Sequence, residues 1–155
     1  AGTAYAERRR ACEEAARALG LASLRDANLA EVRDRPLARH VVTENARVLE
    51  FVEALRANDV NALGPLLLAS HASLRDDYDV STPELDLLVD LLVEHGAIGA
   101  RLTGAGFGGC VVGLVQRNRI DDCAAKVVLG YERKTGLHPT AFAVRPVAGA
   151  SITPD

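Results

Sequence analysis

The chain has 155 residues, of which 48% are hydrophobic but only 4% are aromatic, and it contains neither Trp nor Met. This length is sufficient for about one domain, with a core built from Leu, Val, Ile and Ala. The formal net charge of −3 lacks the excess of basic residues that nucleic-acid binding requires, so we expect no nucleic-acid partner. No run of about 18 apolar residues occurs, so we expect no membrane-spanning helix and no membrane partner.

The three cysteines, Cys12, Cys110 and Cys123, lack any C-x-x-C spacing. An odd set without such spacing is typical of a reducing compartment, where each thiol serves as a small buried apolar group. We therefore expect a cytoplasmic protein with three free, buried cysteines.

Residues 4–19 are rich in Ala, Glu and Arg and are followed by Gly20, a pattern that predicts a helix ended by glycine. The arginines of this segment have glutamates one turn away, so we interpret them as part of a solvated helix face. Residues 21–35 have a shorter, mixed pattern and predict one or two brief helices before Pro36.

Residues 37–57 predict a long helix. Apolar side chains recur along one of its faces at spacings of seven, four and three residues, namely Val41, Val48, Val52 and Leu55. The pattern breaks at Asn58 and Asp59, which are the best candidates for an internal boundary. We therefore expect a helical segment over residues 1–58 and a second unit over residues 59–155.

Two further helices are predicted before the pattern changes. Residues 62–75 have an apolar side made of Leu66, Leu67, Ser70 and Leu74. Ser81 and Glu84 have the S-x-x-E spacing of a capping box, and Pro83 lies in the first turn, where proline is tolerated. The helix that starts there ends at Gly96, and its apolar stripe consists of Leu85, Leu88, Val89 and Leu92.

After Gly96 the apolar period changes from helix-like to strand-like. Residues 97–103 and 110–116 are short, apolar or β-branched, and bounded by glycine, so both predict strands. Residues 121–133 return to helical spacing, and residues 139–146 alternate in a way that predicts a final strand. Helices followed by strand, loop, strand, helix and strand predict an α+β fold, with the helices packed on a small antiparallel sheet.

The segment between the first two predicted strands reads TGAGFGG. Gly104, Gly106 and Gly109 match the dinucleotide-binding pattern G-x-G-x-x-G, but a strand follows them instead of the helix that this pattern requires. A Walker phosphate loop is excluded as well, because Cys110 follows the glycines where Lys and then Ser or Thr are needed. Two interpretations remain open: a tight turn that needs positive φ values, and a loop that another backbone or a ligand approaches closely.

Four segments of the chain resemble one enzyme family. The GHMP small-molecule kinases share a third motif that resembles GARLTGAGFGGCVVGLV, and the segment that precedes this motif in the galactokinase family is similar to SHASLRDDYDVSTPELDLLV. Two earlier segments, YAERRRACEEAARALG and RHVVTENARV, also resemble the galactokinase family and occur in the same order along the chain. The resemblance runs from Tyr5 to about Leu114 and implies the GHMP kinase C-terminal domain, which is ferredoxin-like.

This resemblance implies transfer of the γ-phosphate of ATP, with Mg²⁺, to the anomeric hydroxyl of galactose. Such a reaction needs in-line placement and charge neutralisation more than covalent chemistry. The family's main phosphate loop, Gly-Leu-Ser-Ser-Ser, and its patterns around the catalytic Asp and Arg do not occur in this sequence. We therefore expect a C-terminal portion, inactive alone, that has no catalytic or metal-binding residue and works with ATP, galactose and its own N-terminal part. The absence of a starting Met fits such a fragment.

The resemblance also implies roles for individual residues. A glycine loop shapes the nucleotide site and consists of Thr103, Gly104, Ala105, Gly106, Phe107, Gly108 and Gly109. Ala105 departs from the family, in which many members have Gly, by only a methyl group. Tyr5 matches a tyrosine that contacts a sugar hydroxyl, and the alternative is a half-buried core tyrosine with a solvated hydroxyl.

A second set of residues, the signature segment, lies at the end of the predicted helix 62–75 and consists of Ser70, His71, Ser73, Arg75, Asp76 and Asp77. An acid–base pair or metal cluster of His71 with the two aspartates is disfavoured, because the spacing does not force these side chains together. We expect an architectural role instead, in which Arg75 pairs with Asp76 and Asp77 and the segment positions the glycine loop and a domain interface. We interpret His40 as structural as well.

Three other functions stay open on the sequence alone. The first is a different GHMP kinase that acts on another sugar, such as an N-acetylated one or arabinose. The second is a protein of the same fold that has lost catalysis and serves as a sugar sensor, and the third is a free-standing binding domain of the α+β class. Sequence upstream of this chain distinguishes the first two from a galactose kinase, because the sugar signature and the catalytic Asp lie there.

Overall fold

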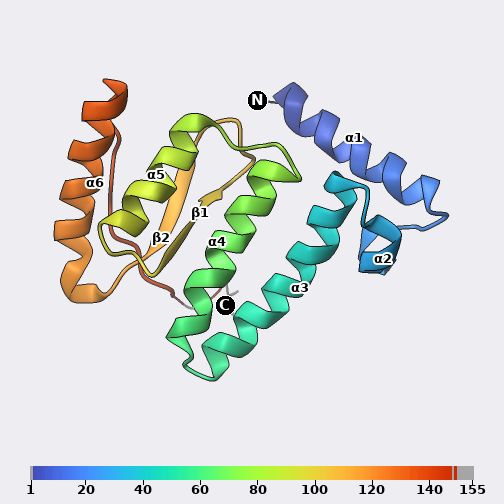
Figure 1. Cartoon of the computed structure of the whole chain (residues 1–155), viewed down its shortest axis with the longest axis horizontal. Coiled ribbons are helices and arrows are strands. Elements are labelled where there is room, and N and C mark those ends of the chain that lie inside the picture. Colours follow the sequence, from blue (N-terminus) through green and yellow to red (C-terminus); the bar gives the residue numbers. More distant parts are fainter. Residues whose placement is uncertain (1, 148, 150–155) are drawn as a thin grey trace, which may run out of the picture.

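The computed structural model describes residues 2–147 and 149, and its elements follow the predicted order up to the last helix (Figure 1). Helices α1, α2 and α3 form one side of the molecule, α4 runs through its centre, and α5 and α6 lie on the other side (Figure 1). The elements in chain order are α1 (Gly2–Ala18), the 3₁₀ turn η1 (Leu24–Asp26), α2 (Leu29–Val32), α3 (Pro36–Arg56), α4 (Val60–Asp76), α5 (Pro83–Glu94), β1 (Gly99–Thr103), β2 (Cys110–Leu114), the 3₁₀ turn η2 (Arg117–Arg119) and α6 (Ile120–Thr135).

The start of α5 differs by one residue from the predicted capping box. Thr82 is the N-cap, and its hydroxyl accepts a hydrogen bond from the Leu85 N–H. The hydroxyl of Ser81 instead donates to the Asp86 carboxylate at 2.6 Å. The capping box predicted from Ser81 is therefore wrong, whereas Pro83 occupies the first turn as predicted.

The two strands form one antiparallel pair that is buried on one face. Ala100 lies opposite Gly113 and Leu102 opposite Val111, and both Ala100 and Leu102 are fully buried. Helix α5 contacts both strands, and α6 packs against α5 on its far side (Figure 1). The core next to the β1–β2 connection consists of Leu74, Val80, Leu85 and Leu102, with Phe107 and Val111 packed against it.

Helix α4 is held against β1 by a contact between two glycines. A Cβ atom on Gly99 would lie 2.6 Å from the carbonyl oxygen of Gly64 and 2.7 Å from its Cα atom. These distances are far below van der Waals contact, so the two backbones touch with no room for a side chain. This contact sets how deeply the strand lies against the central helix.

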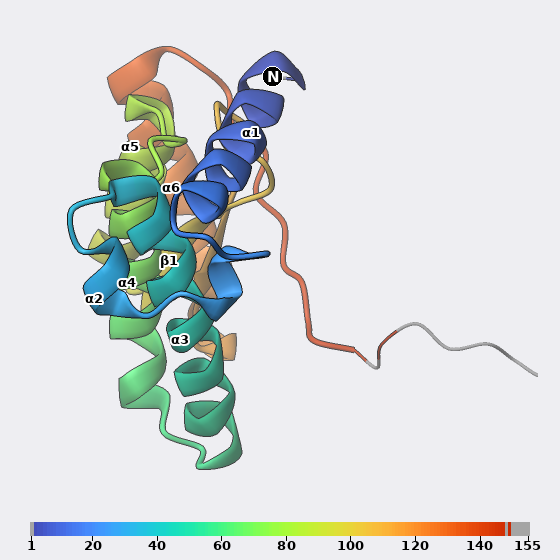
Figure 2. The same cartoon turned by 90° about the vertical axis from the view of Figure 1, so that its right-hand side faces the viewer.

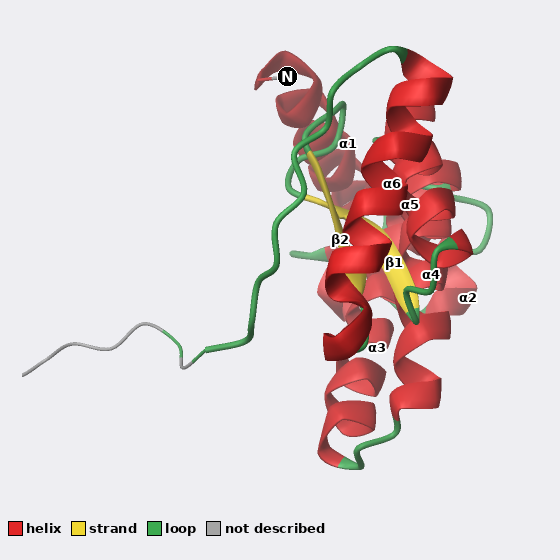
Figure 3. Ribbon diagram, turned by 90° about the vertical axis from the view of Figure 1, so that its left-hand side faces the viewer, coloured by secondary structure: helices red, strands yellow, loops and turns green. Residues whose placement is uncertain are grey.

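The predicted α+β class, with helices on a small antiparallel sheet, is confirmed, but the final strand is wrong. Residues 139–146 leave the body of the molecule as an extended segment without strand pairing (Figures 2 and 3). The alternating side chains of this segment are solvent-exposed, with Phe142 at 76% and Val144 at 65%. A strand requires a hydrogen-bonded neighbour, and among the described residues β1 and β2 pair only with each other. The order α5–β1–β2–α6 matches the middle of a ferredoxin-like β-α-β-β-α-β unit.

No helix in the part of the chain that the structure describes has the length and apolarity needed to cross a membrane.

The contact between Gly64 and Gly99 generates a first prediction. We expect Gly99→Ala to lower the free energy of unfolding by about 1–3 kcal/mol, because the new methyl group overlaps backbone atoms that cannot move aside. Chemical unfolding in urea measures this change. Gly113→Ala on the neighbouring strand is the control, since the nearest atoms to its Cβ belong to the movable side chain of Leu92, at 3.1 Å. Equal losses of stability for both variants would contradict the proposed packing constraint.

Candidate functional site

The glycine loop connects β1 to β2 and has an unusual backbone. Its glycines have positive φ values, 91° at Gly104, 80° at Gly106, 116° at Gly108 and 101° at Gly109. Phe107 has a φ of 59°, in the small left-handed region that non-glycine residues rarely occupy. The glycine values lie beyond that region, so these positions favour glycine for backbone reasons alone.

Gly106 is the position at which another segment approaches the loop closely. A Cβ atom there would lie 2.6 Å from the Cβ atom of Val80 and closer still to the Val80 carbonyl oxygen. That oxygen accepts a hydrogen bond of 2.7 Å from the Phe107 N–H. Close approach by the turn between α4 and α5 therefore accounts for Gly106.

The other side of the loop is open. Apart from each glycine and its two chain neighbours, no described residue places an atom within 4 Å of the Cβ positions of Gly104, Gly108 or Gly109. Ala105 is exposed and does not have a positive φ, so the loop accommodates its methyl group without strain. Thr103, the last residue of β1, is exposed as well. The loop thus presents mainly backbone atoms on this side.

Helix α1 lies beside the glycine loop (Figures 1 and 2). The Arg8 guanidinium carbon is 5.9 Å from the centroid of the Phe107 ring, and Arg8 Nη2 donates to the carboxylate of Asp79 at 2.6 Å and to its carbonyl oxygen at 2.9 Å. Tyr5, about one turn earlier on α1, is 54% exposed. The structure brings Tyr5 and the glycine loop to the same end of the molecule.

His71 of the signature segment is buried and contacts the strand that leads into the loop. Its Nδ1 accepts a hydrogen bond of 3.3 Å from the Leu102 N–H in β1, so that nitrogen carries no proton. Its Nε2 lies 3.1 Å from Asp86 Oδ1, and the Asp86 carboxylate opposes the effect of burial on the pKa of the ring. Burial lowers the pKa of His71 below its ordinary value, and the imidazole is neutral.

A second polar cluster centres on Glu44 of α3. Its carboxylate accepts hydrogen bonds from the Ser70 hydroxyl at 2.6 Å, from Arg101 of β1 at 2.7 Å and from Arg47 at 2.8 Å. Burial by itself raises the pKa of Glu44, but the bonds from Ser70 and Arg47, together with the charges of Arg101 and Arg47, hold it below its ordinary value. Sequence reasoning missed this cluster, because Ser70 and Arg101 are 26 and 57 residues from Glu44, and the Glu44–Arg47 pair alone reads as an ordinary i,i+3 pair on a helix surface.

The third cluster joins the end of α4 to the start of α3. The Ser73 hydroxyl lies 3.0 Å from His40 Nδ1 and 3.1 Å from an Asp77 oxygen. Asp77 also accepts from Arg39, and this bond holds the pKa of Asp77 below its ordinary value. The His40 ring stacks on Tyr78 at a centroid distance of 4.5 Å. His40 of α3 is therefore held against the end of α4 by Ser73 and against the following turn by Tyr78.

The aspartates of the signature segment have different partners. Arg75 pairs with Asp76 on the surface at 2.7 Å, whereas Asp77 pairs with Arg39. The expected pairing of Arg75 with both aspartates is therefore wrong for Asp77, which points towards α3 instead. His71 hydrogen-bonds to neither aspartate. Among the described residues, no three His, Cys, Asp or Glu side chains gather in a way that holds a metal ion.

The three cysteines are free but not equally buried. Cys123 is buried, and burial raises the pKa of its thiol. Cys12 is half-buried, with its sulfur 3.8 Å from the Tyr78 hydroxyl, and burial together with this contact raises the pKa of Tyr78 to about 12. Cys110 is exposed at the start of β2, so the prediction of three buried thiols is wrong there.

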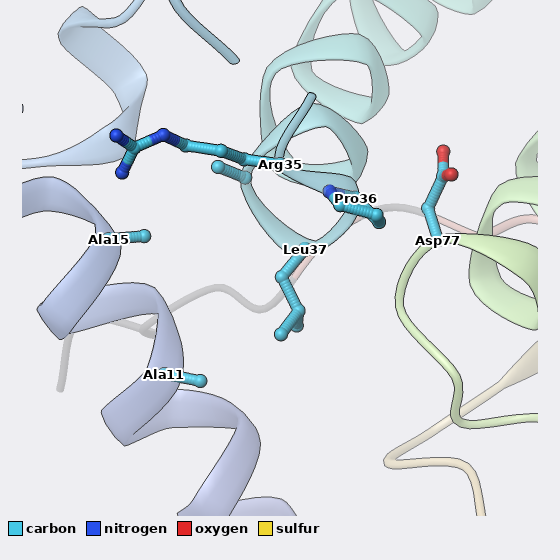
Figure 4. Close-up of a pocket in the computed structure, with 7 residues that line it drawn as sticks. Ala11, Ala15, Arg35, Pro36, Leu37 and Asp77 are labelled. Atoms are coloured by element: carbon cyan, nitrogen blue, oxygen red, sulfur yellow. The ribbon is translucent and has the colours of Figure 1, made fainter. Parts of the chain in front are cut away.

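A shallow hollow lies between α1 and the start of α3. Figure 4 shows the methyl groups of Ala11 and Ala15 facing Leu37 across it. Its lining is mostly apolar and consists of Ala11, Ala15, Arg35, Pro36, Leu37, Ala38 and Asp77. Neither Tyr5 nor any residue of the glycine loop lines it, so it is separate from the predicted site.

Comparison with known proteins identifies relatives of this chain. The family model described as GHMP kinases C terminal matches residues 51–132. A galactokinase from Haemophilus influenzae is 43% identical over 96% of this chain and 42% of its own length. A galactokinase from Chloroflexus aurantiacus is 48% identical over 88% of this chain and 39% of its own length.

A solved structure has a similar fold. The crystal structure of Lactococcus lactis galactokinase complexed with galactose superposes with a TM-score of 0.81 and 35% sequence identity, over 87% of this chain and 39% of that one. The chain spans about two fifths of the length of the curated relatives described above, at 42% and 39%.

The buried histidines generate a prediction about pH. Burial lowers the pKa values of His40 and His71 below 6.5, so the folded chain resists protonation while the unfolded chain accepts it. The unfolded state then binds more protons as the pH falls, and the free energy of unfolding decreases as the pH is lowered through about 6.5. NMR titration of the imidazole ring protons measures the two pKa values. Midpoints at or above 6.5 for both rings would contradict this assignment.

The matched variant is His71→Asn. The amide oxygen replaces Nδ1 as an acceptor for the Leu102 N–H, and the side chain does not titrate. We expect the urea midpoint of this variant to depend less steeply on pH between about 7.5 and about 5.5 than that of the unsubstituted chain.

Proposed function

The chain belongs to the GHMP kinase family, through the C-terminal domain of that family, and from this premise we propose that it is the C-terminal portion of a galactokinase. The observation that carries the proposal is the identity of 43–48% to galactokinases over 88–96% of the chain. The full-length enzyme would transfer the γ-phosphate of ATP to the anomeric hydroxyl of galactose and release galactose 1-phosphate. The reacting groups would come from the part that this chain lacks.

We assign the glycine loop to the nucleotide site. The open side of the loop supports this role, because Gly104, Gly108 and Gly109 leave backbone atoms accessible to a partner that comes very close. Unobstructed backbone N–H groups suit phosphate oxygens, so the loop fits a nucleotide neighbour. ATP supplies the phosphoryl group, and we assign Mg²⁺ to the rest of the enzyme, since the described residues bring no acidic cluster together.

We assign Tyr5 to the sugar side of the site. Tyr5 is exposed on α1, the helix that lies beside the glycine loop, which leaves the phenol free to meet a ligand. A tyrosine offers an apolar ring and a hydroxyl that both donates and accepts, which suits a sugar.

The signature segment has an architectural role in this proposal. Ser70, His71 and Ser73 are buried and bond to other elements, Ser70 to α3, His71 to β1 and Ser73 to α3. Buried polar networks of this kind fix one arrangement of the elements they join. The segment would thereby hold β1, and the loop that follows it, in register with α3 and α4.

We propose that the partner of this chain is the N-terminal part of the same enzyme. Val48 and Leu55 of α3, each 53% exposed, and Val112 of β2, 40% exposed, offer apolar surface for it. We propose a division into a helical segment, residues 1–58, and a C-terminal unit, residues 59–155, and most of the family match, residues 51–132, lies in the second. We place the enzyme in the cytoplasm, because a free, exposed thiol such as Cys110 suits a reducing compartment.

The proposal is tested by assaying the full-length enzyme and this chain side by side. With ATP, Mg²⁺ and galactose, we expect the full-length enzyme to form galactose 1-phosphate and the chain alone to form none. N-acetylgalactosamine and arabinose serve as competing substrates. Preference for one of them would replace galactose in the proposal, and turnover by the chain alone would refute the view that the chemistry lies elsewhere.

The role of the glycine loop is tested by Gly108→Val in the full-length enzyme. We expect the KM for ATP to rise at least about tenfold, because a branched side chain enters the space assigned to the nucleotide or its neighbouring loop. Gly136→Val is the control, since Gly136 also has a positive φ, 71°, and open surroundings but lies at the end of α6. An unchanged KM for ATP in Gly108→Val would contradict the assignment.

A further inference from the structure

Arg8 is the side chain through which α1, the α4–α5 turn and the glycine loop meet. Its Nη2 donates to both the backbone carbonyl and the carboxylate of Asp79, in the turn. Its guanidinium also lies 5.9 Å from the centroid of the Phe107 ring, in the loop, within the range of a cation–π contact. The turn and the loop in turn bond to each other through the Phe107 N–H and the Val80 carbonyl oxygen.

Both partners of Arg8 have a left-handed backbone. Asp79 has a φ of 54°, which aspartate tolerates, and Phe107 has a φ of 59°, which is disfavoured for a bulky residue. Such conformations persist where surrounding contacts determine them and tend to gather at functional sites. Arg8 supplies a contact to each of the two residues, so it stabilises the conformation that both of them adopt.

The surroundings of Arg8 differ from those of its neighbour on α1. The Arg8 side chain is 24% exposed, and its Nε atom is buried without a hydrogen-bond partner. Arg9 is 74% exposed and pairs only locally, with Glu13 one turn on. A buried donor without a partner carries a cost, so the position of Arg8 is determined by its contacts to the turn and the loop.

We propose that Arg8 is a positioning residue of the active site that fixes the glycine loop relative to the helix that carries Tyr5. The guanidinium suits this task, because its Nη2 donates to Asp79 while its central carbon lies over the Phe107 ring. Tyr5 lies three residues earlier on the same helix. Any movement of Arg8 relative to the glycine loop therefore changes the distance between Tyr5, assigned to the sugar, and the loop, assigned to the nucleotide. This inference rests on the proposed function, in which Tyr5 faces the sugar and the loop faces the nucleotide.

The experiment compares Arg8→Met, Arg8→Lys and the matched control Arg9→Met in the full-length enzyme. Methionine retains a long apolar stem without charge, and lysine restores the charge but not the planar fork. We expect Arg8→Met to raise the KM for ATP at least about tenfold, Arg8→Lys to recover part of this loss, and Arg9→Met to match the unsubstituted enzyme. A merely structural defect lowers the fraction of active enzyme, and therefore the apparent kcat, while KM stays constant.

Hydrogen–deuterium exchange of the same variants supplies a readout that does not depend on activity. We expect Arg8→Met, but not Arg9→Met, to speed exchange in the peptides that contain Phe107 and Val80. Unchanged exchange in Arg8→Met would overturn the inference, and faster exchange with an unchanged KM for ATP would overturn the active-site role. Failure of the unsubstituted full-length enzyme to phosphorylate galactose would instead refute the proposed function, while the exchange result still decides whether Arg8 holds the loop.

Discussion

The site region depends on the close fit between the glycine loop and the turn that joins α4 to α5. Gly106 lies against Val80 without space for a side chain, and the Phe107 N–H bonds to the Val80 carbonyl oxygen. Val80 itself is almost fully buried among Leu74, Leu85 and Leu102. A backbone hydrogen bond next to such a packed core is shielded from water, so the loop has a defined anchor at its midpoint. The ends of the loop are anchored by the strand pair.

Polar side chains of α3 and α4 fix the position of β1, the strand that leads into the glycine loop. His71 bonds to the Leu102 N–H, and Glu44 bonds to Arg101, so adjacent residues of β1 are held from α4 and α3 respectively. Removing one partner from such a pair leaves a buried group without compensation, which costs more than the bond contributes in net terms. The polar residues in this part of the chain therefore specify one arrangement of α3, α4 and β1. Apolar packing alone would tolerate small shifts between these elements.

The sequence predicts elements well where a local pattern determines them. Apolar spacing and glycine or proline boundaries place all the long helices and both strands of the sheet, because these signals act within one or two turns. The prediction of Ser81 as the helix cap fails, because the adjacent Thr82 hydroxyl is equally able to cap and accepts the bond from the Leu85 N–H, while Ser81 donates to Asp86. The final strand fails for a different reason: alternation shows that residues 139–146 suit a sheet, but strand formation requires a partner that the described chain does not provide.

Candidate site residues show the same division between local and distant causes. The sequence shows that the loop is rich in glycine, but the reason for each glycine becomes clear only from the structure. All four glycines have φ values that disfavour a Cβ atom, and at Gly106 a neighbouring segment excludes it as well. Both causes lead to the same result, a loop whose outer surface consists largely of backbone. The partners that hold this loop, Arg8 above all, become visible only after folding, because Arg8 and Asp79 are 71 residues apart and the sequence of α1 read alone resembles a solvated helix face.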